Sequence, residues 1–593
     1  MPFRLTPQRR QPEPPASDRE RTPPSPLEVV LGYHEATKHH SYRFARSLGY
    51  LDWDTQPDPF RRYRGARWLP LDQVPPTPEP GYGALFRPGA IAPQPVDRHS
   101  ISALVYYSLA LSAWKEYGKA RWSLRVNPSS GNLHPTEGYL LGGPVPDLLP
   151  APALCHYDPR GHGLELRREL TAAQWQALSS GLPRDALLVG LASIHWRESW
   201  KYGERAFRYC QHDVGHAVAA LALAAASLGW EVRLLESLGD AELDVLLGIM
   251  GQSGIEAEHA DCLLAVYPQG AAFGVNQQQA FRVEPSMLEA LAATPLAGHP
   301  NRLSPEHHDW DIIDAVAQAS RRDGPPGVDF WQPAVGASGS DPLLPPAGDG
   351  QPARRIIRQR RSAVAMDGIT RIDRETFYPM LARTLPGHPP FDALPWQPAI
   401  HLALFVHRVD GLAAGLYLLV RDPEQEAALR DTMDPAFVWQ RPAGCPPSLS
   451  LFLLRAGDYR AVAQSVSCGQ EIASHGVFAL GMLAQYRERL RRHGPWFYRR
   501  LHWEAGAVGQ VLYLEAEAAG LRGTGIGCFF DDLVHQVVGL TDERFQSLYH
   551  FTVGGPEEDP RLSSQPPYEH LAPSRGAAAH RPSSASQPGR RIG

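Results

Sequence analysis

Lysine is nearly missing from this sequence. Only four of its 58 basic residues are lysine, at positions 38, 115, 119 and 201, and arginine supplies the rest. A basic surplus is missing as well, because 63 acidic residues outnumber the basic ones and the formal net charge is −5. A chain without a basic bias lacks the electrostatic footprint of a nucleic-acid-binding protein. We therefore predict no nucleic-acid partner. Because lysine is so rare here, each of the four lysines is considered for a functional role.

Long apolar runs are also absent. The best stretch, residues 217–228, has about 12 residues, against the roughly 18–20 that a membrane helix needs. The N-terminus is rich in proline and arginine and has no apolar segment of the secretory-signal kind. We therefore predict a cytoplasmic protein with no membrane partner.

Cysteine is sparse and scattered. The six cysteines contain no C-x-x-C pair, so the sequence indicates neither a zinc site nor a disulfide framework, and no metal site is predicted. They are Cys155, Cys210, Cys262, Cys445, Cys468 and Cys528.

What the sequence does have is room for two cores. A chain of 593 residues, 43% of them hydrophobic, suits a pair of cores of roughly 200 residues each. Three stretches rich in Pro, Gly, Ser or Arg have the composition of chain that does not fold. The predicted organisation is a disordered N-terminal tail over residues 1–26, an N-terminal domain over 27–320, a Pro/Gly-rich linker over 321–353, a C-terminal domain over 354–560 and a disordered C-terminal tail over 561–593.

The two halves carry similar segments in the same order. An Arg-x-Ser precedes an apolar stretch in each, at residues 98–100 before ISALVYYSLALSAW and at residues 360–362 before a segment ending in FYPML. Each half later has a long Ala-rich stretch, FRYCQHDVGHAVAALALAAASLGW in the first and YRRLHWEAGAVGQVLYLEAEAAGLRG in the second. Small residues at helical spacing let two helices approach closely. We predict that these are the central helices of two related cores.

Short strand-like runs complete the pattern. They follow Pro-rich turns near residues 138–143, 262–267, 401–407, 449–454 and 550–555. Helices with intervening strands predict an α+β fold, and the repeated order predicts a duplicated unit.

The most informative segment is RVNPSSGNLHPTE, residues 125–137. Pro128 and Gly131 impose a turn, and Ser129, Ser130 and Asn132 offer donors at what the spacing predicts to be a helix start. Exposed N–H groups at such a start favour phosphate or another anion. A capped helix with a solvated Ser-Ser turn explains the same residues, because capping turns are common.

Several strings resemble the FMN-dependent nitroreductase family. PSSGNLHPTEGYLL resembles the family segment that precedes a strand and holds the flavin, and the Arg-x-Ser pairs resemble its phosphate-binding pair. The chain is most similar to the SagB/ThcOx-type dehydrogenases, the branch that oxidises azolines in ribosomally made peptides. The further strings are YHEATKHH at 33–40, WKYGERAFRY at 200–209 and GTGIGCFFDD at 523–532. The resemblance spans about residues 30–558 and implies two fused nitroreductase-like domains that form a pseudo-dimer within one chain.

The resemblance also implies where FMN binds. In nitroreductase homodimers one subunit gives the Arg-x-Ser and a C-terminal glycine segment, and the other gives the Pro-Ser-Ser-x-Asn segment. One full set is assembled here by Pro128, Ser129, Ser130 and Asn132 of the first half with Arg360, Ser362, Gly525, Ile526 and Gly527 of the second. The reciprocal set, Arg98 and Ser100 with the segment PGHPPFDALPWQPAIHL, lacks the Ser-Ser-x-Asn element. We therefore predict one FMN per chain.

Lys201 and Tyr202 are the predicted catalytic pair. In the azoline-oxidising branch a matching Lys-Tyr pair is thought to do acid–base work while FMN takes a hydride. A lysine with a lowered pKa, or a tyrosine activated by it, can accept the proton that aromatisation releases. The alternative is that Lys201 is an exposed residue of the polar stretch WRESWKYGER. In the second half, the corresponding stretch PWFYR has no lysine.

Three other signals are weaker. His212 and His216 share a helical face, but no third metal ligand is evident, so helix packing or capping is favoured. The run Lys38-His39-His40 is interpreted as a solvated or interface segment, with substrate contact as the alternative. The glycines of residues 523–527 follow a helix-like stretch and do not open a strand–helix unit, so a dinucleotide loop is disfavoured.

The predicted function is that of an FMN-dependent oxidoreductase, most like an azoline dehydrogenase. Its substrate would be a modified peptide or a small heterocycle, and peptide-modifying enzymes would be its partners. One alternative is a generic NAD(P)H-dependent nitroreductase or quinone reductase. Another is a flavin-free scaffold in a peptide-modifying complex. FMN would supply the redox chemistry, and the protein would supply position and proton transfer.

Overall fold

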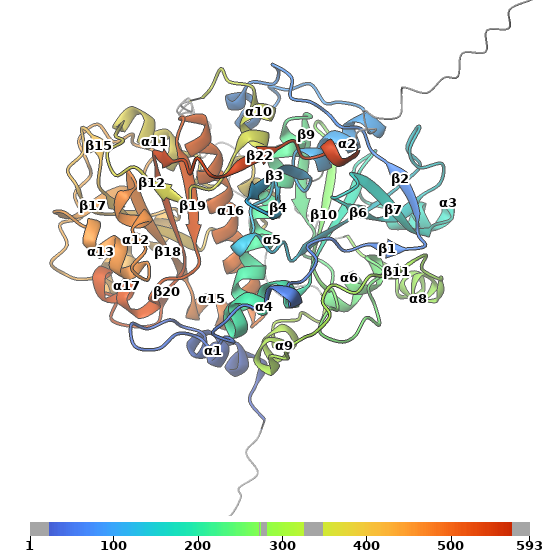
Figure 1. Ribbon diagram of the computed structural model, residues 1–593, viewed down its shortest axis with the longest axis horizontal. Helices are drawn as coiled ribbons and strands as arrows, with labels where there is room; N and C mark the ends of the chain where they lie inside the picture. Colours follow the sequence, from blue (N-terminus) through green and yellow to red (C-terminus); the bar gives the residue numbers. More distant parts are fainter. Residues whose placement is uncertain (1–22, 272, 274–280, 325–347, 572–593) are drawn as a thin grey trace, which may run out of the picture.

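The computed structural model describes residues 23–271, 273, 281–324 and 348–571. Most of the predicted N-terminal tail and linker, and the end of the predicted C-terminal tail, lie outside the described residues. Within them, two mixed helix-and-sheet halves stand side by side, one on each side of a central pair of helices (Figure 1). The α+β prediction and the duplicated unit are both confirmed. No helix among the described residues is long and apolar enough to span a bilayer.

Each half is built on its own sheet. The first has the order β2-β7-β6-β5-β8-β10-β9, and the second has the order β17-β16-β14-β18-β20-β19. All neighbouring strands of both sheets pair antiparallel. The strands are β2 (Arg67–Pro70), β5 (Thr136–Gly142), β6 (Ala153–Asp158), β7 (Gly163–Glu169), β8 (Leu187–Ser193), β9 (Trp230–Leu234), β10 (His259–Pro268), β14 (Ile400–Val406), β16 (Gly415–Leu419), β17 (Leu451–Ala456), β18 (Phe478–Gln485), β19 (Arg522–Ile526) and β20 (Phe545–Gly554).

The five strand-like runs found in the sequence all fall on these strands, namely β5, β10, β14, β17 and β20. Of these, β5, β14 and β20 are buried along their whole length, which explains why they form nearly continuous apolar runs in the sequence. The helices that accompany the sheets are α1 (Pro26–Ala36), α2 (Arg98–Tyr106), α3 (Ala172–Leu178), α4 (His195–Tyr202), α6 (Asp240–Leu246), α8 (Pro285–Ala293), α9 (Asp311–Ala319), α10 (Ala353–Gln359), α11 (Arg374–Ala382), α12 (Glu426–Thr432), α13 (Arg460–Val466), α14 (Ile472–His475), α15 (Arg487–His493) and α17 (Asp531–Val538).

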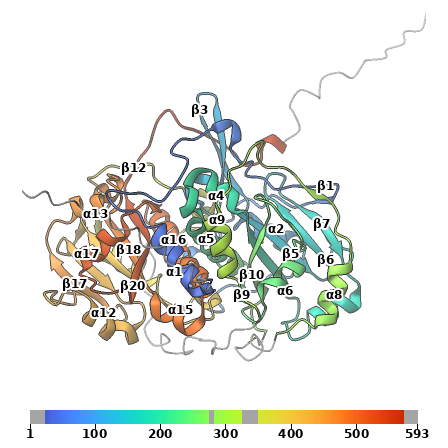
Figure 2. The ribbon, with the colours of Figure 1, turned by 90° about the horizontal axis from the view of Figure 1, so that it is seen from below.

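The two long Ala-rich stretches are the central helices, α5 (Ala206–Ala226) and α16 (Phe497–Ala518), and every residue of both is buried. They lie side by side between the sheets (Figures 1 and 2). They cross at Gly215 and Gly506, where a Cβ on either glycine would collide with the backbone of the other helix. Close approach through small residues, as predicted, therefore joins the halves into one core.

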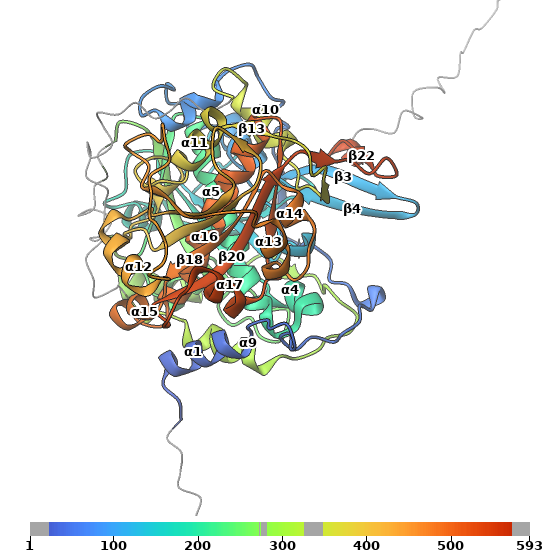
Figure 3. The ribbon, with the colours of Figure 1, turned by 90° about the vertical axis from the view of Figure 1, so that its left-hand side faces the viewer.

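One predicted helix is wrong in its second part. The stretch ISALVYYSLALSAW was expected to be helical throughout, but α2 ends at Tyr106 and a strand, β3 (Leu111–Tyr117), follows. That strand pairs with β4 (Ala120–Arg125), and the hairpin projects from the body of the protein (Figure 3). An apolar run alone does not distinguish a helix from a strand, and here the pairing with β4 decides.

The folded chain continues beyond residue 560, the boundary expected from the sequence. Strand β22 (Ser563–Gln565) adds to β3 of the hairpin. Tyr568 is buried, and its hydroxyl accepts a hydrogen bond from the Leu111 amide. A segment of the second half thus holds the base of a hairpin that belongs to the first.

The remaining short strand pairs are β1 (Tyr63–Arg64) with β11 (His299–Pro300), β12 (Ala365–Met366) with β21 (Pro556–Glu557), and β13 (Ile372–Asp373) with β15 (Val409–Asp410).

Candidate functional site

A cavity of about 700 Å³ lies where the two halves meet. The first half lines it with the loop before β5 and with side chains of α5 and the β3–β4 hairpin. The second half contributes the segment after α10 together with α16, β19 and β20. Its volume is in the range of cofactor pockets. The predicted site residues among its walls are Pro128, Ser129, Ser130, Asn132, Tyr202, Arg360, Ser362, Gly525, Ile526 and Gly527.

The loop before β5 is a single 3-10 turn rather than the expected helix start. The turn covers Ser130–Asn132, and β5 begins at Thr136. Gly131 and Asn132 both have left-handed backbones, with φ of 57° and 60°. Without an α-helix behind the turn, the helix-dipole argument for anion binding does not apply to this loop.

Side-chain hydrogen bonds hold the loop in place. The side-chain amide of Asn132 donates a hydrogen bond to the Ser123 carbonyl at 2.7 Å, and the backbone amide of His134 donates one to Ser129 Oγ at 2.8 Å. Ser129 and Asn132 are thus partly used to shape the loop that they were predicted to equip for binding.

The second half presents a Ser-Tyr-Gly arrangement on the opposite wall. The Tyr513 hydroxyl accepts a hydrogen bond from the Gly525 amide at 2.9 Å and lies 3.0 Å from Ser362 Oγ. The backbone of Ser362 also forms an isolated parallel β-bridge with Gly523 of strand β19. A Cβ on Gly525 or Gly527 would collide with Tyr549 or Tyr209. The glycines are therefore needed for the close packing of this wall.

Positive charge gathers at one part of the cavity. Arg360 and Arg361 form no ion pair among the described residues and donate only to backbone carbonyls. Burial and the neighbouring Arg360 charge lower the pKa of Arg361 to about 9. Arg522, close by, pairs with Glu517. Two half-buried or buried guanidinium groups without a carboxylate partner are a suitable anchor for a phosphate.

Two carboxyl groups lie buried beneath the first-half loop. Asp213 of α5 accepts hydrogen bonds from the Ser130 amide at 3.1 Å and its hydroxyl at 3.3 Å. Glu198 Oε1 lies 3.4 Å from Ser129 Oγ. Burial raises the pKa of Asp213 to about 7. Burial, and then the charge of Asp213, raises the pKa of Glu198 well above its usual range. The pair can hold a proton near neutral pH directly under the cavity wall.

Lys201 and Tyr202 end helix α4 beside the same loop. A Cβ on Gly131 would lie 3.1 Å from Lys201 Nζ and closer still to the Tyr202 hydroxyl, so both polar groups reach the loop where it has no side chain. Tyr202 lines the cavity and contacts the ring of Tyr209. Burial, followed by the charge of Glu198, raises the pKa of Tyr202 well above its usual range. A raised pKa favours the neutral phenol, so Tyr202 is better suited to donate a hydrogen bond than to act as a deprotonated base.

The reciprocal set is not assembled around this cavity. Arg98 donates through Nε to Asp72 at 3.0 Å, and Ser100 forms a capping box with Asp97 at the start of α2. Neither residue lines the cavity. Both are engaged with their own half.

The Pro-rich segment that would complete the reciprocal set is packed as core. Phe391, Leu394 and Trp396 are buried, and the Trp396 indole donates to Glu504 of α16 at 3.2 Å. Large apolar side chains therefore occupy the segment before β14, whereas the segment before β5 carries the Ser-Ser loop.

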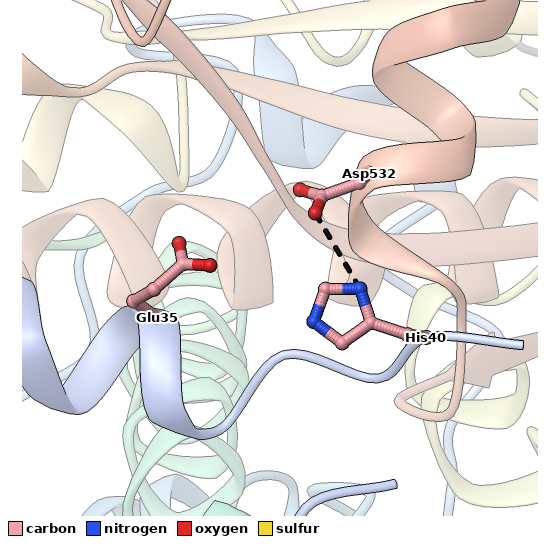
Figure 4. A group of neighbouring side chains, drawn as sticks. All are labelled: Glu35, His40 and Asp532. Carbon is pink, nitrogen blue, oxygen red and sulfur yellow. Dashed lines mark ion pairs between the residues drawn. The ribbon is translucent and has the colours of Figure 1, made fainter. Parts of the chain in front are cut away.

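The run Lys38-His39-His40 lies between the halves. Figure 4 shows His40 with Glu35 and Asp532, whose ligand atoms all lie within 4.8 Å of one another. The Lys38 ammonium, however, lies 2.8 Å from Glu35 and 2.9 Å from Asp532. The positive charge that a cation would bring is thus already provided. We assign the group to the contact between α1 and α17.

His212 and His216 make aromatic contacts. The His212 ring stacks on Tyr549 at 4.3 Å between centroids, and His216 Nε2 lies 3.2 Å from the Tyr549 hydroxyl. Burial lowers the pKa of His216 to about 3, so the ring is neutral. The i, i+4 spacing serves packing of α5 against β20.

Sequence reasoning did not identify Arg361, Arg522, Tyr513, Glu198 or Asp213 as parts of the site. Only two signals could have found any of them. Arg361 is the middle residue of an Arg-x-Ser already singled out, and Asp213 is the acidic residue shared by the two Ala-rich stretches. Arg522, Tyr513 and Glu198 reach the site through the fold alone.

Comparison with known proteins adds the following. The model described as "Nitroreductase family" matches residues 92–266 and 424–555, more than half of the chain. No curated protein matches the sequence. A structure from Anabaena variabilis, assigned as a nitroreductase, is 22% identical, covers 89% of this chain and 99% of its own, and has a TM-score of 0.62. At that identity the likeness concerns the fold.

Two further structures align at a TM-score of 0.25, which adds nothing about the fold. One, from Ralstonia eutropha and also assigned as a nitroreductase, is 17% identical over 38% of this chain and 98% of its own. The other, an E. coli microcin synthetase complex, is 16% identical over 39% of this chain and 77% of its own.

Proposed function

The chain belongs to the nitroreductase family, and we propose on that premise that it is an FMN-dependent oxidoreductase with one composite site per chain. The observation that supports the proposal most is the cavity between the halves. It combines the loop of residues 128–132 with Arg360, Ser362, Gly525 and Gly527. These are the two sets of residues that nitroreductase homodimers take from different subunits.

The residues of the cavity fit FMN. Arg360 and Arg361, which have no ion-pair partner in the described part of the chain, offer cationic groups to a phosphate. Gly525 and Gly527 let this wall of the cavity pack directly against Tyr549 and Tyr209, because a Cβ at either position would meet a tyrosine. The loop of residues 128–132 and Tyr209 would close the opposite side. We propose that these residues hold the cofactor.

When bound, FMN supplies the two-electron chemistry by accepting a hydride. The chain's own residues then handle the proton. We propose Lys201 as the base that takes the proton from a carbon acid, with Tyr202 donating a hydrogen bond as a neutral phenol. Asp213 can hold that proton afterwards, because burial raises its pKa to about 7 beneath the same loop.

Aromatisation of a thiazoline or oxazoline requires this division of labour, because one carbon-bound hydrogen leaves as hydride and another as a proton. We therefore propose an azoline in a modified peptide or a small heterocycle as the substrate, with peptide-modifying enzymes as partners. An NAD(P)H-dependent nitroreductase would differ by rapid reduction of its flavin by NAD(P)H.

The test begins with the visible spectrum of the purified protein and the ratio of released FMN to protein. We expect two flavin bands and about one FMN per chain. A ratio near two would contradict the single composite site, and a protein that stays colourless with added FMN would contradict the function.

A second measurement tests the catalytic pair. In Lys201→Ala we expect the flavin to be retained and turnover of an azoline substrate to fall by a factor of about 10²–10⁴, the usual contribution of a general base. Lys119→Ala, on the turn of the projecting hairpin, is the matched control. Unchanged turnover in Lys201→Ala would remove Lys201 as the base.

A further inference from the structure

Two cysteines that are distant in sequence meet at the wall of the cavity. Cys528 directly follows Gly527 and lines the cavity, and Cys468 lies on the loop between α13 and α14. Their Sγ atoms are 2.8 Å apart, and both residues are partly exposed free thiols. A small side-chain adjustment would bring the sulfurs to the disulfide bond length of about 2.05 Å. No spacing rule joins these residues, so the sequence did not indicate the pair.

Noncovalent contacts hold the two segments together independently of the sulfurs. The side-chain amide of Gln470 donates hydrogen bonds to the Ser467 carbonyl at 2.9 Å and to the Cys528 carbonyl at 3.0 Å. The Phe530 amide donates to the Val466 carbonyl at 2.8 Å. Residues within two positions of each cysteine are therefore joined by hydrogen bonds, so an S–S bond can form and break while the segments stay in place.

The backbone and the charges distinguish the two thiols. Cys468 has φ of 55°, in the left-handed region that few non-glycine residues adopt. The Sγ–Sγ hydrogen bond, and then the Arg205 charge, lower the pKa of Cys528. The same hydrogen bond, with burial, raises the pKa of Cys468. One sulfur is thus favoured as a thiolate beside a partner that keeps its proton, which suits thiol–disulfide chemistry.

We propose that Cys468 and Cys528 are a redox-active pair that exchanges two electrons with the flavin of the cavity. The inference rests on the proposed function, which provides the flavin. In the oxidising direction both S–H bonds break and one S–S bond forms. Two electrons and two protons leave the thiols and reduce the oxidised flavin. In the opposite direction reduced flavin returns them and the S–S bond breaks. Dithiols or disulfides would then be a further class of electron donor or acceptor for this protein.

The experiment uses the full chain, freed of flavin and prepared in two forms without oxygen. One form has its thiols reduced by dithiothreitol and is mixed with one equivalent of oxidised FMN. The other is oxidised by glutathione disulfide and is mixed with one equivalent of photoreduced FMN. Three quantities are measured: the flavin absorbance, the number of thiols that react with a thiol reagent, and the peptide that carries the 468–528 cross-link by mass spectrometry.

We expect electron exchange in one of the two mixtures. Either FMN is bleached while two thiols disappear, or reduced FMN regains its colour while two thiols appear. Cys468→Ser should bind FMN as the wild type does and exchange no electrons with it. Cys445→Ser, which changes another partly exposed thiol, is the matched control and should behave as the wild type.

Other outcomes separate the two proposals. If FMN binds and neither mixture exchanges electrons, the redox pair is overturned and the proposed function stands. If glutathione disulfide forms no 468–528 cross-link, the pair is overturned as well. If FMN does not bind to the folded wild type, the proposed function fails and this inference fails with it.

Discussion

The two halves share a scaffold but use one matched position in opposite ways. Asp213 on α5 and Glu504 on α16 each lie two residues before the glycine at which the helices cross. Each accepts hydrogen bonds from residues before or at the start of a strand of its own half. Asp213 accepts from Ser130, and Glu504 accepts from the Ala399 and Ile400 amides.

The difference lies in the neighbours of these carboxylates. Glu504 is ion-paired with buried Arg421 and accepts from the Trp396 indole. Asp213 has no ion pair, and its Oδ2 has no hydrogen-bond partner, among the described residues. In the second half the carboxylate completes a closed core. In the first half it remains incompletely satisfied beneath a cavity, which is typical of a functional site.

The largest expected effect is on stability. Glu504→Gln leaves the buried Arg421 charge without its partner, and breaking such a pair costs about 3–5 kcal/mol of unfolding free energy. Asp213→Asn removes a buried charge that has no cationic partner among the residues described, so we expect a change below about 1 kcal/mol or a gain in stability at pH 8. Urea unfolding of both variants measures this. Equal losses would break the comparison between the halves.

The next effect concerns pH. Burial raises the pKa of Asp213 from 3.8 to about 7, so the folded chain keeps a proton that the unfolded chain loses. Its contribution to stability therefore falls as pH rises from about 4 to 7. At about 1.4 kcal/mol per pKa unit, wild type should lose about 2–4 kcal/mol relative to Asp213→Asn over this range. Urea unfolding at pH 4.5 and pH 8 checks it. Parallel pH profiles for the two proteins would rule out the raised pKa.

A third effect compares the two Arg-x-Ser segments. Arg360 faces the cavity without an ion pair among the described residues, whereas Arg98 is bound to Asp72 outside it. Charge-assisted hydrogen bonds contribute about 1.5–3 kcal/mol, so Arg360→Ala should weaken FMN binding by about 10–100-fold. Arg98→Ala should leave it unchanged. Flavin fluorescence titration measures both dissociation constants, and an equal loss in both variants would point to a second FMN site.

The fold was largely predictable because its signals are local. The Ala-rich stretches and the strand runs each reveal their own periodicity or burial, and the order of segments repeats. The hairpin strand β3 was not predictable from the sequence, because the apolar run LSAW is compatible with both a buried helix and a strand. Its strand state depends on pairing with β4 and with β22, a partner more than 400 residues away in sequence.

The site was predictable only where a string of residues carries it. The loop of residues 128–132 and the glycine-rich stretch of residues 523–527 were recognisable as strings. Tyr513 was not, because it is one aromatic among many on a buried helix, and only the fold brings its hydroxyl to Gly525. Cys468 and Cys528 were likewise judged separately and were found to be neighbours only in three dimensions.

The smallest expected effect is on FMN affinity, and it tests the hydroxyl of Tyr513. Tyr513 joins Ser362 and Gly525 on the cavity wall, whereas the position that matches it on α5 is Ala222, which has no polar side chain. In the first half, Ser100 donates instead to the Pro95 carbonyl within its own turn.

Tyr513→Phe removes the acceptor of the Gly525 amide and so disturbs the cavity wall. At about 1 kcal/mol for one hydrogen bond, we expect FMN binding to weaken about fivefold and the free energy of unfolding to fall by a similar amount. Ser100→Ala should leave FMN binding unchanged, because its hydroxyl serves only the start of α2. Fluorescence titration with both variants decides the matter. Weaker binding in Ser100→Ala alone would mean that the flavin depends on the first-half Arg-x-Ser, and that the two halves exchange the roles assigned to them here.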